Sequence, residues 1–338
     1  MALIPVMPST KLKNGLEVCK IINGMWQVSG AHGNIEPQRA VLAMNNYADV
    51  GFTSFDMADI YGPAEDIFGT FIKSRGVDMT GIRGLTKMVP RVGEMTREKV
   101  EKLVTKSMHR MSVDKLDCLQ FHWWDYSDKR YLDAMKHLRD IQVDGKIKEL
   151  SLTNFSTEVM EEIVGNGIPI STNQVQFSLV DTRPQKRMAE FCEKNSIKLF
   201  AYGVLCGGLL SEKYLGVAEP KPHELITASL SKYKHIIDLW GGWALFQELL
   251  QVVHTIAEEH TVSIANVATR YILDQPVVAS VIIGCRFGIA DSDHTEDNFR
   301  SISQTWSLTK ENLATIEAVQ NKSNDLFSVL GDCGGEYR

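Results

Sequence analysis

The chain has 338 residues, of which 44% are hydrophobic and 23% are charged, and its formal net charge is −6. This composition predicts a globular protein with a large core, and the acidic balance and the lack of a long apolar run argue against nucleic acid and membrane as partners. The six cysteines are scattered without a Cys-x-x-Cys pair and no signal peptide is evident, so we expect a cytoplasmic protein.

Short buried runs alternate with helical stretches along the chain. The Asn14-Gly15 dipeptide predicts a tight hairpin between residues 10–12 and 16–19, and the first candidate barrel strand follows at residues 21–26. Further strands are predicted to end at residue 56 and to cover residues 84–90, 116–124, 149–152, 171–175, 198–202 and 278–284. Helices are predicted at residues 37–50, 65–74, 96–108, 131–143, 158–164, 185–195, 243–259, 264–274, 295–302 and 310–321, and residues 213–231 are expected to form a loop-rich passage.

This alternation predicts the fold class. Strand and helix alternate about eight times without a break, which favours parallel strands joined by right-handed crossovers. We therefore expect an α/β protein with a closed (β/α)₈ TIM barrel, preceded by the N-terminal β-hairpin and followed by an extra C-terminal helix. The length fits a single barrel domain over residues 1–338. No Gly-x-Gly-x-x-Gly sequence follows the first strand, which argues against a Rossmann fold.

Titratable side chains stand at the predicted C-terminal ends of three consecutive strands. In a parallel barrel the loops that follow these ends all open onto one face, where the active site lies. The second to fourth strands bring Asp56, Tyr61, Lys87 and His122 to this face. Any one of them alone is compatible with a structural role, such as a buried ion pair between Lys87 and Asp56. Four such groups on one rim favour an active site.

The four side chains suggest a division of roles. A phenol with an ordinary pKa of about 10 is a poor acid at neutral pH, and a nearby ammonium group lowers that pKa. We expect Lys87 to do this for Tyr61, while Asp56 keeps Lys87 charged and oriented. His122 is placed to hydrogen-bond a carbonyl oxygen. This set fits proton donation to an oxyanion that forms as a carbonyl is reduced.

Hydride for such a reduction must come from a nicotinamide cofactor, because no side chain supplies it. Thr153, Asn154 and Gln174 carry donors and acceptors that suit the nicotinamide carboxamide. Tyr202, at the end of the seventh barrel strand, offers a flat face on which the nicotinamide ring can stack.

Several motifs along nearly the whole chain resemble those of the aldo-keto reductase superfamily, in the same order. Residues 56–62 resemble its Asp-x-Ala-x-x-Tyr-Gly signature, and residues 145–148 with 152–156 resemble its Gly-Lys-Ile-Arg…Val-Ser-Asn-Phe-Ser stretch. Residues 173–177 resemble its Asn-Gln-Val-x-Tyr run, and residues 201–210 resemble Ala-Tyr-Ser-Pro-Leu…Gly-Leu-Leu. The resemblance implies an eight-stranded barrel that reduces an aldehyde or ketone.

The resemblance also implies the cofactor and the site residues. NADPH is the preferred cofactor that it implies, with NADH possible, bound in an extended form across the rim. The implied catalytic residues are Asp56, Tyr61, Lys87 and His122, with Tyr61 as the proton donor. The implied cofactor-binding residues are Gly24, Asp56, Thr153, Asn154, Gln174, Tyr202, Gly203, Leu205, Gly284, Arg286 and Asn298. No metal site is expected.

Two departures from the family pattern concern the cofactor. Gly203-Val204 replaces the usual Ser-Pro, which removes a hydroxyl that would contact the pyrophosphate. Residues 283–286 resemble the phosphate loop of the family, and we predict that Arg286 binds the 2′-phosphate, because a guanidinium matches phosphate geometry. Asn298, which we expect to contact the adenine, stands a few residues later in the chain than in the family pattern, because the acidic residues 291–294 precede it. These inserted acids weaken the case for NADP relative to NAD. This acidic loop lacks the glycine of a calcium-binding loop.

Aromatic residues indicate the substrate side of the rim. Trp26, Trp123 and Trp124 are predicted to line a mostly apolar pocket for a small-molecule carbonyl substrate. The segment 213–240 is expected to form a partial lid over it. The sequence identifies neither the substrate nor the oligomeric state.

Three other functions remain open at this point. A cofactor-binding regulatory subunit of the same fold, similar to potassium-channel β subunits, binds NADPH yet acts mainly on a partner. A different barrel enzyme would use Lys87 as a Schiff-base nucleophile. An alcohol dehydrogenase would run the same chemistry toward oxidation.

Overall fold

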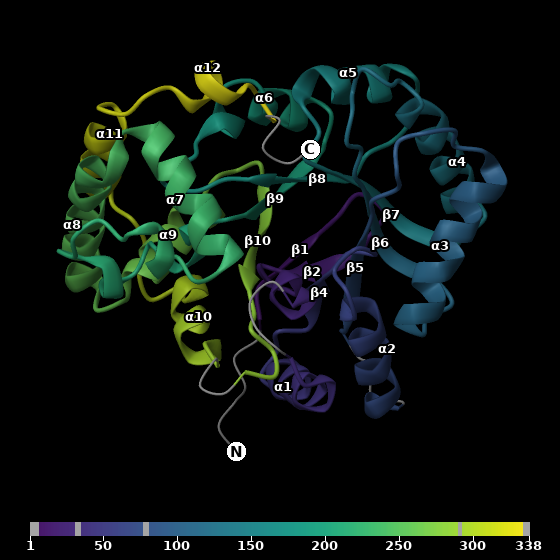
Figure 1. Cartoon of the computed structure of the whole chain (residues 1–338), viewed down its shortest axis with the longest axis horizontal. Coiled ribbons are helices and arrows are strands. Elements are labelled where there is room, and N and C mark those ends of the chain that lie inside the picture. Colours follow the sequence, from purple (N-terminus) through teal and green to yellow (C-terminus); the bar gives the residue numbers. More distant parts are fainter. Residues whose placement is uncertain (1–6, 31–34, 77–80, 290–292, 334–338) are drawn as a thin grey trace.

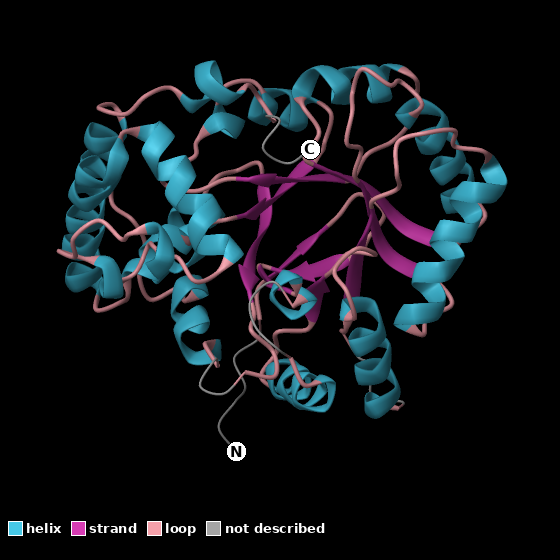
Figure 2. Cartoon of the chain, in the orientation of Figure 1, coloured by secondary structure: helices cyan, strands magenta, loops and turns pink. Residues whose placement is uncertain are grey.

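Eight parallel strands form a closed barrel in the computed structural model, which describes residues 7–30, 35–76, 81–289 and 293–333. The strands follow one another around the barrel in sequence order, and the last pairs with the first. They are β3 (Ile21–Gly24), β4 (Ser54–Asp56), β5 (Arg83–Met88), β6 (Leu116–Phe121), β7 (Ile147–Thr153), β8 (Thr172–Gln176), β9 (Lys198–Tyr202) and β10 (Val278–Gly284). Figure 2 shows the ring of strands with helices around it. The predicted (β/α)₈ barrel is confirmed.

Helices cover the outside of the barrel, as Figure 1 shows. Most of them bury apolar residues against the barrel. In the third helix, residues 97–111, the hydroxyl of Thr96 caps the N-terminus by accepting a hydrogen bond from the Lys99 backbone N–H at 3.3 Å. The main helices are α1 (Pro37–Asp49), α2 (Ala64–Arg75), α3 (Arg97–Met111), α4 (Tyr131–Val143), α5 (Thr157–Gly165), α6 (Met188–Lys194), α8 (Gly242–His260), α9 (Ile264–Leu273) and α10 (Thr295–Ile302). The expected extra C-terminal helix is present as α11 (Lys310–Gln320), followed by the short α12 (Leu326–Leu330). Within the described residues, no helix has the length and apolar character needed to cross a membrane.

The predicted N-terminal hairpin is confirmed and closes the N-terminal end of the barrel. It consists of β1 (Ser9–Lys11) and β2 (Glu17–Cys19). The buried carboxylate of Glu149, near the start of β7, accepts hydrogen bonds from the backbone N–H groups of Asn14 at 2.8 Å and Leu16 at 3.2 Å. Ser171 also donates its hydroxyl to Glu149. A buried carboxylate needs hydrogen-bond donors, and here the hairpin supplies two of them. The Glu149 carboxylate therefore holds the hairpin against the barrel.

The segment after β9 differs from the prediction. It contains three short 3₁₀ turns, η3 (Cys206–Gly208), η4 (Glu212–Tyr214) and η5 (Pro222–Glu224), and then a full helix, α7 (Ala228–Trp240). The hydroxyl of Thr227 caps α7 by accepting from the Leu230 backbone N–H at 3.2 Å. The expectation of a loop-rich passage up to residue 231 is therefore wrong from residue 228 onward. Apolar residues at helical spacing, from Leu230 to Trp240, bury one side of α7 and hold it as a helix.

Candidate active site

Asp56 ends β4 and holds its carboxylate inside the C-terminal end of the barrel. Its Oδ2 accepts a hydrogen bond from Lys87 Nζ at 2.5 Å. Its Oδ1 accepts from Gln120 Nε2 at 2.7 Å and from Gln174 Nε2 at 2.8 Å. Asp56 is only 3% exposed, so these donors replace the water that the carboxylate has lost. One carboxylate thus joins the ends of β5, β6 and β8.

Lys87 is the cation at the centre of the site. Burial acts to lower the pKa of Lys87, but Asp56 and Tyr61 together outweigh it, and the pKa is raised above its ordinary value. The side chain is therefore an ammonium group at neutral pH. Its Nζ also donates to the Met57 carbonyl oxygen at 3.2 Å and lies 5.0 Å from the centre of the Tyr61 ring. A Schiff-base lysine needs a neutral amine, so this environment argues against Lys87 as a nucleophile.

Tyr61 stands in the turn between β4 and α2, where its backbone N–H donates to the Ala58 carbonyl oxygen at 3.1 Å. Lys87 acts to lower the pKa of this phenol, as expected, but it is not the largest influence on that pKa. Burial raises the pKa of Tyr61, Lys87 lowers it by less, and the net shift is upward. The loss of water raises the free energy of the phenolate form by more than the neighbouring ammonium group lowers it. The ammonium has a reduced effect because Asp56 also neutralises its charge. Tyr61 therefore carries its proton at neutral pH.

His122 directly follows β6 and is buried at 6% exposure. Its ring packs against Trp124 with 4.8 Å between the ring centres, and Trp124 is 37% exposed. The side chain of Trp123 is fully buried; its Nε1 donates to the Asp128 carbonyl oxygen at 2.9 Å and its ring packs on Phe121. Successive residues point to opposite sides here. The structure thus brings His122 and Trp124 together and does not bring Trp123 to the rim.

The ends of β7 and β8 form a second polar group. Thr153 is paired with Gln174 across the two strands, and the Asn154 backbone N–H donates to the Gln174 carbonyl oxygen at 2.9 Å. Asn154 has a left-handed backbone with φ of 58°, and its Oδ1 accepts from the Tyr202 hydroxyl at 2.8 Å. The Thr153 hydroxyl is buried and has no hydrogen-bond partner among the described residues. An unpartnered buried hydroxyl at a strand end is available to a ligand.

Glycines stand at the ends of β3 and β10, where neighbouring groups leave little room for a side chain. Gly24 and Gly284 pair across these strands, and Gly284 is exposed. A side chain at Gly284 would put its Cβ 2.1 Å from Gln27 Nε2, and one at Gly24 would put it 2.9 Å from Ile282 Cγ2. Arg286 is exposed two residues beyond Gly284. The exposed residues Gly284 and Arg286 therefore stand where a ligand at this edge can reach them.

The remaining predicted cofactor residues lie near β9 and in α10. Gly203 and Leu205 follow β9, and Leu205 is half-buried at the start of η3. Asn298 lies in α10 and is buried, and its Nδ2 has no hydrogen-bond partner within the described part of the chain. Asp291 and Ser292 of the acidic segment lie outside the described residues.

Gln120 is a site residue that the sequence interpretation missed. It is fully buried in β6, donates to Asp56 and accepts from Gln174 Nε2 at 2.6 Å. A signal was present, because Gln120 lies two residues before His122 and therefore on the same inward face of the strand. A polar residue at such a position predicts a partner inside the barrel.

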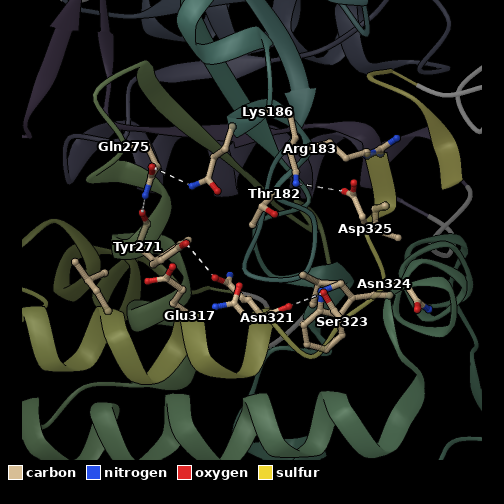
Figure 3. Close-up of a pocket in the computed structure, with 16 residues that line it drawn as sticks. Thr182, Arg183, Lys186, Tyr271, Gln275, Glu317, Asn321, Ser323, Asn324 and Asp325 are labelled. Atoms are coloured by element: carbon tan, nitrogen blue, oxygen red, sulfur yellow. Dashed lines mark hydrogen bonds and ion pairs between the residues drawn. The ribbon is translucent and has the colours of Figure 1, made fainter. Parts of the chain in front are cut away.

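A cavity of about 610 Å³ is lined by residues of the segment after β8, of α9 and of α11 (Figure 3). Several of the polar groups that line it bond to one another: Gln185 donates to Gln275 at 3.2 Å, and Tyr271 donates to Gln320 at 3.4 Å. None of the site residues predicted from the sequence is among its lining residues in the described part of the chain. The cavity is therefore separate from the candidate active site.

The chain is similar to known proteins over most of its length. The sequence model of the aldo/keto reductase family matches residues 20–321. The chain is 26% identical to the aldo-keto reductase YhdN of Bacillus subtilis, over 80% of this chain and 82% of that protein. It is 31% identical to flagellar radial spoke protein 5 of Chlamydomonas reinhardtii over 48% of this chain, a match that spans only 34% of that protein. A solved structure of a glycerol dehydrogenase from Gluconobacter oxydans shares the fold, with a TM-score of 0.76, 23% identity, and coverage of 95% of this chain and 96% of that chain.

Proposed function

The chain belongs to the aldo/keto reductase family, and on this basis we propose that it is an NADPH-dependent reductase that converts an aldehyde or ketone into an alcohol. The observation that carries the proposal is the Asp56–Lys87–Tyr61 arrangement. A protonated phenol lies beside an ammonium group that is itself held by a buried carboxylate. This arrangement suits proton transfer to a carbonyl oxygen.

The four catalytic residues have separate roles in this proposal. When bound, the dinucleotide supplies the hydride that reaches the carbonyl carbon. Tyr61 donates its proton to the carbonyl oxygen, so that the carbonyl becomes an alcohol. Lys87 stabilises the phenolate that remains on Tyr61, and Asp56 keeps Lys87 charged and in place. His122 hydrogen-bonds the carbonyl oxygen and orients it toward Tyr61.

The residues on the rim fit a nicotinamide dinucleotide. Thr153 has a buried hydroxyl without a partner among the described residues, and Asn154 lies next to it. Gln174 uses its Nε2 on Asp56 and Gln120, so its Oε1 is the atom that we assign to the carboxamide. The ring of Tyr202 provides a face for the nicotinamide. We assign Gly24, Gly203, Leu205, Gly284, Arg286 and Asn298 to the rest of the cofactor.

The substrate is proposed to enter beside Trp26 and Trp124, which are both accessible at the rim. Trp26 follows β3 and Trp124 follows β6, so the two rings lie on different sides of the barrel mouth. Aromatic walls favour a small carbonyl compound with an apolar part.

We also propose one domain and a cytoplasmic location. The N-terminal hairpin bonds to Glu149 of the barrel, which supports a single folded unit. Five of the cysteines, Cys19, Cys118, Cys192, Cys206 and Cys285, are buried free thiols, as a reducing compartment favours.

A binding titration followed by turnover tests the proposed function. Tryptophan fluorescence is followed as NADPH is added to the whole protein, and an aromatic aldehyde is then supplied. We expect saturable binding and a loss of NADPH absorbance. Binding without turnover across a panel of aldehydes and ketones would favour the regulatory alternative instead, and a protein that binds no nicotinamide dinucleotide would overturn the proposal.

Arg286 is expected to set the preference for NADPH over NADH. Replacing Arg286 by alanine removes an exposed guanidinium that we assign to the 2′-phosphate, a group that only NADPH carries. We expect the Kd for NADPH to rise by roughly tenfold or more and the Kd for NADH to change little, since a hydrogen bond to a charged group contributes about 1.5–3 kcal/mol. The two cofactors are titrated in parallel, and equal weakening of both would remove this role.

A further inference from the structure

Helix α7 packs directly on the turn that follows β9, and two glycines make this close approach possible. A Cβ at Gly207, where φ is 67°, would lie 2.9 Å from the Ser229 carbonyl oxygen. A Cβ at Gly203, where φ is 73°, would lie 2.6 Å from the hydroxyl oxygen of Tyr233. Figure 1 shows α7 as a green helix, and it contacts η3, the turn that follows β9. A helix from the long connection between β9 and β10 therefore reaches the rim at the position assigned to the cofactor.

Tyr233 occupies the space that a side chain at position 203 would take. It is 5% exposed, and its ring carbon Cε1 would stand 2.7 Å from the same hypothetical Cβ. The hydroxyl that is absent at Gly203 is thus replaced, in the same place, by a hydroxyl from α7. This gives the departure at Gly203 a structural reason: glycine there allows α7 to reach the rim.

Lys232, the neighbour of Tyr233, places a positive charge above this part of the rim. Its Nζ lies 5.2 Å from the centre of the Tyr202 ring and 5.7 Å from the centre of a Trp26 ring. Tyr202 ends β9, Trp26 follows β3, and β10 runs between these two strands in the barrel. The ammonium group therefore lies over the end of β10, where Gly284 exposes its backbone.

We propose that Lys232 binds a phosphate of the dinucleotide, so that α7 forms one wall of the cofactor site. This inference rests on the proposed function. The charge lies 5.2 Å from the centre of the Tyr202 ring, which is assigned to the nicotinamide, and β10, which pairs with β9, ends two residues before Arg286, the cation assigned to the 2′-phosphate. The pyrophosphate of an extended dinucleotide lies between those same two ends.

The aromatic contacts of Lys232 are weak enough for its ammonium group to leave them and bind a phosphate instead. An ammonium group over an aromatic ring gains modest attraction, and a charge-assisted bond to a phosphate oxygen is stronger. A nicotinamide ring that stacks on Tyr202 takes the place of the ammonium on that face. The flexible stem of the lysine then carries the charge to the adjacent phosphate.

The test is a Lys232→Met variant of the whole protein, titrated with NADPH and with NADH by tryptophan fluorescence at one ionic strength. Methionine keeps an unbranched side chain and removes the charge. The pyrophosphate is common to both cofactors, so we expect both Kd values to rise about tenfold with their ratio unchanged. Lys102→Met, which removes an exposed charge from α3 on the outer surface, is the matched control and is expected to leave both Kd values unchanged.

Further arms of the experiment separate the possible failures. Unchanged Kd values in a folded Lys232→Met protein would overturn this inference and leave the proposed function intact, whereas a wild-type protein that binds neither cofactor would overturn both. If the cofactor Kd values stay the same and the KM rises for 4-carboxybenzaldehyde but not for 4-nitrobenzaldehyde, Lys232 serves a substrate carboxylate and the inference is wrong. Lys232→Arg keeps the charge and is expected to retain cofactor binding. This variant shows that the loss of binding in Lys232→Met comes from the missing charge and not from misfolding.

Discussion

Replacing Tyr61 by phenylalanine is expected to lower kcat by about 100- to 10,000-fold, the range that a positioned general acid contributes. The substitution keeps the ring that lies 5.0 Å from Lys87 Nζ and removes only the hydroxyl. Burial keeps the pKa of Tyr61 above its ordinary value, so the wild-type side chain holds a proton that the variant lacks. The cofactor Kd is expected to stay within about twofold of wild type, because we assign no cofactor contact to this hydroxyl.

The measurement is steady-state reduction of one aldehyde together with the fluorescence titration of NADPH. Tyr214→Phe provides a matched control, since it removes the hydroxyl of a half-buried tyrosine in η4 that we place outside the site. Equal turnover by the Tyr61 variant would show that another group donates the proton. A parallel loss of cofactor binding would instead mean that Tyr61 helps to build the cofactor site.

Replacing Lys87 by methionine is expected to lower the free energy of unfolding by about 3–5 kcal/mol, in addition to abolishing turnover. Both partners of this ion pair are almost fully buried, with 3% and 4% of their side-chain surface exposed. The variant leaves the Asp56 carboxylate buried with two amide donors and no compensating charge. A urea titration followed by circular dichroism measures the loss.

Two further variants establish the physical cause. Asp56→Asn combined with Lys87→Met leaves no unpaired charge, so the double variant is expected to recover part of the lost stability. Lys234→Met is the contrasting control, because the partners of Lys234, Glu219 and Asp238, are 57% and 47% exposed and return to water. We expect Lys234→Met to cost about 1 kcal/mol or less. A double variant no more stable than Lys87→Met alone would contradict the explanation by an unpaired charge.

The barrel and the centre of the site were predictable because they follow from chain order. Regular alternation of buried runs with helical stretches is a local signal, and parallel strands necessarily bring their C-terminal ends together. Asp56, Lys87 and Gln174 were placed on one rim by this argument alone, and in the structure Lys87 and Gln174 both donate to Asp56.

Other features depend on packing that chain order does not show. Helix α7 was missed because its apolar residues, such as Leu230 and Ile237, follow a passage of loop-forming residues that was extended too far. The pKa of Tyr61 depends on how completely the fold removes water from it, which a list of neighbouring charges does not reveal. Gln120 was overlooked because β6 was considered only at its end, although its inward spacing from His122 was visible.

The link between the hairpin and Glu149 has a consequence for the order in which contacts form during synthesis on the ribosome. Glu149 is separated from Asn14 by 135 residues, and Ser171, which also donates to Glu149, is synthesised later still. The hairpin therefore leaves the ribosome well before the partners that anchor it. Its hydrogen bonds to the barrel form only once β7 and β8 are available.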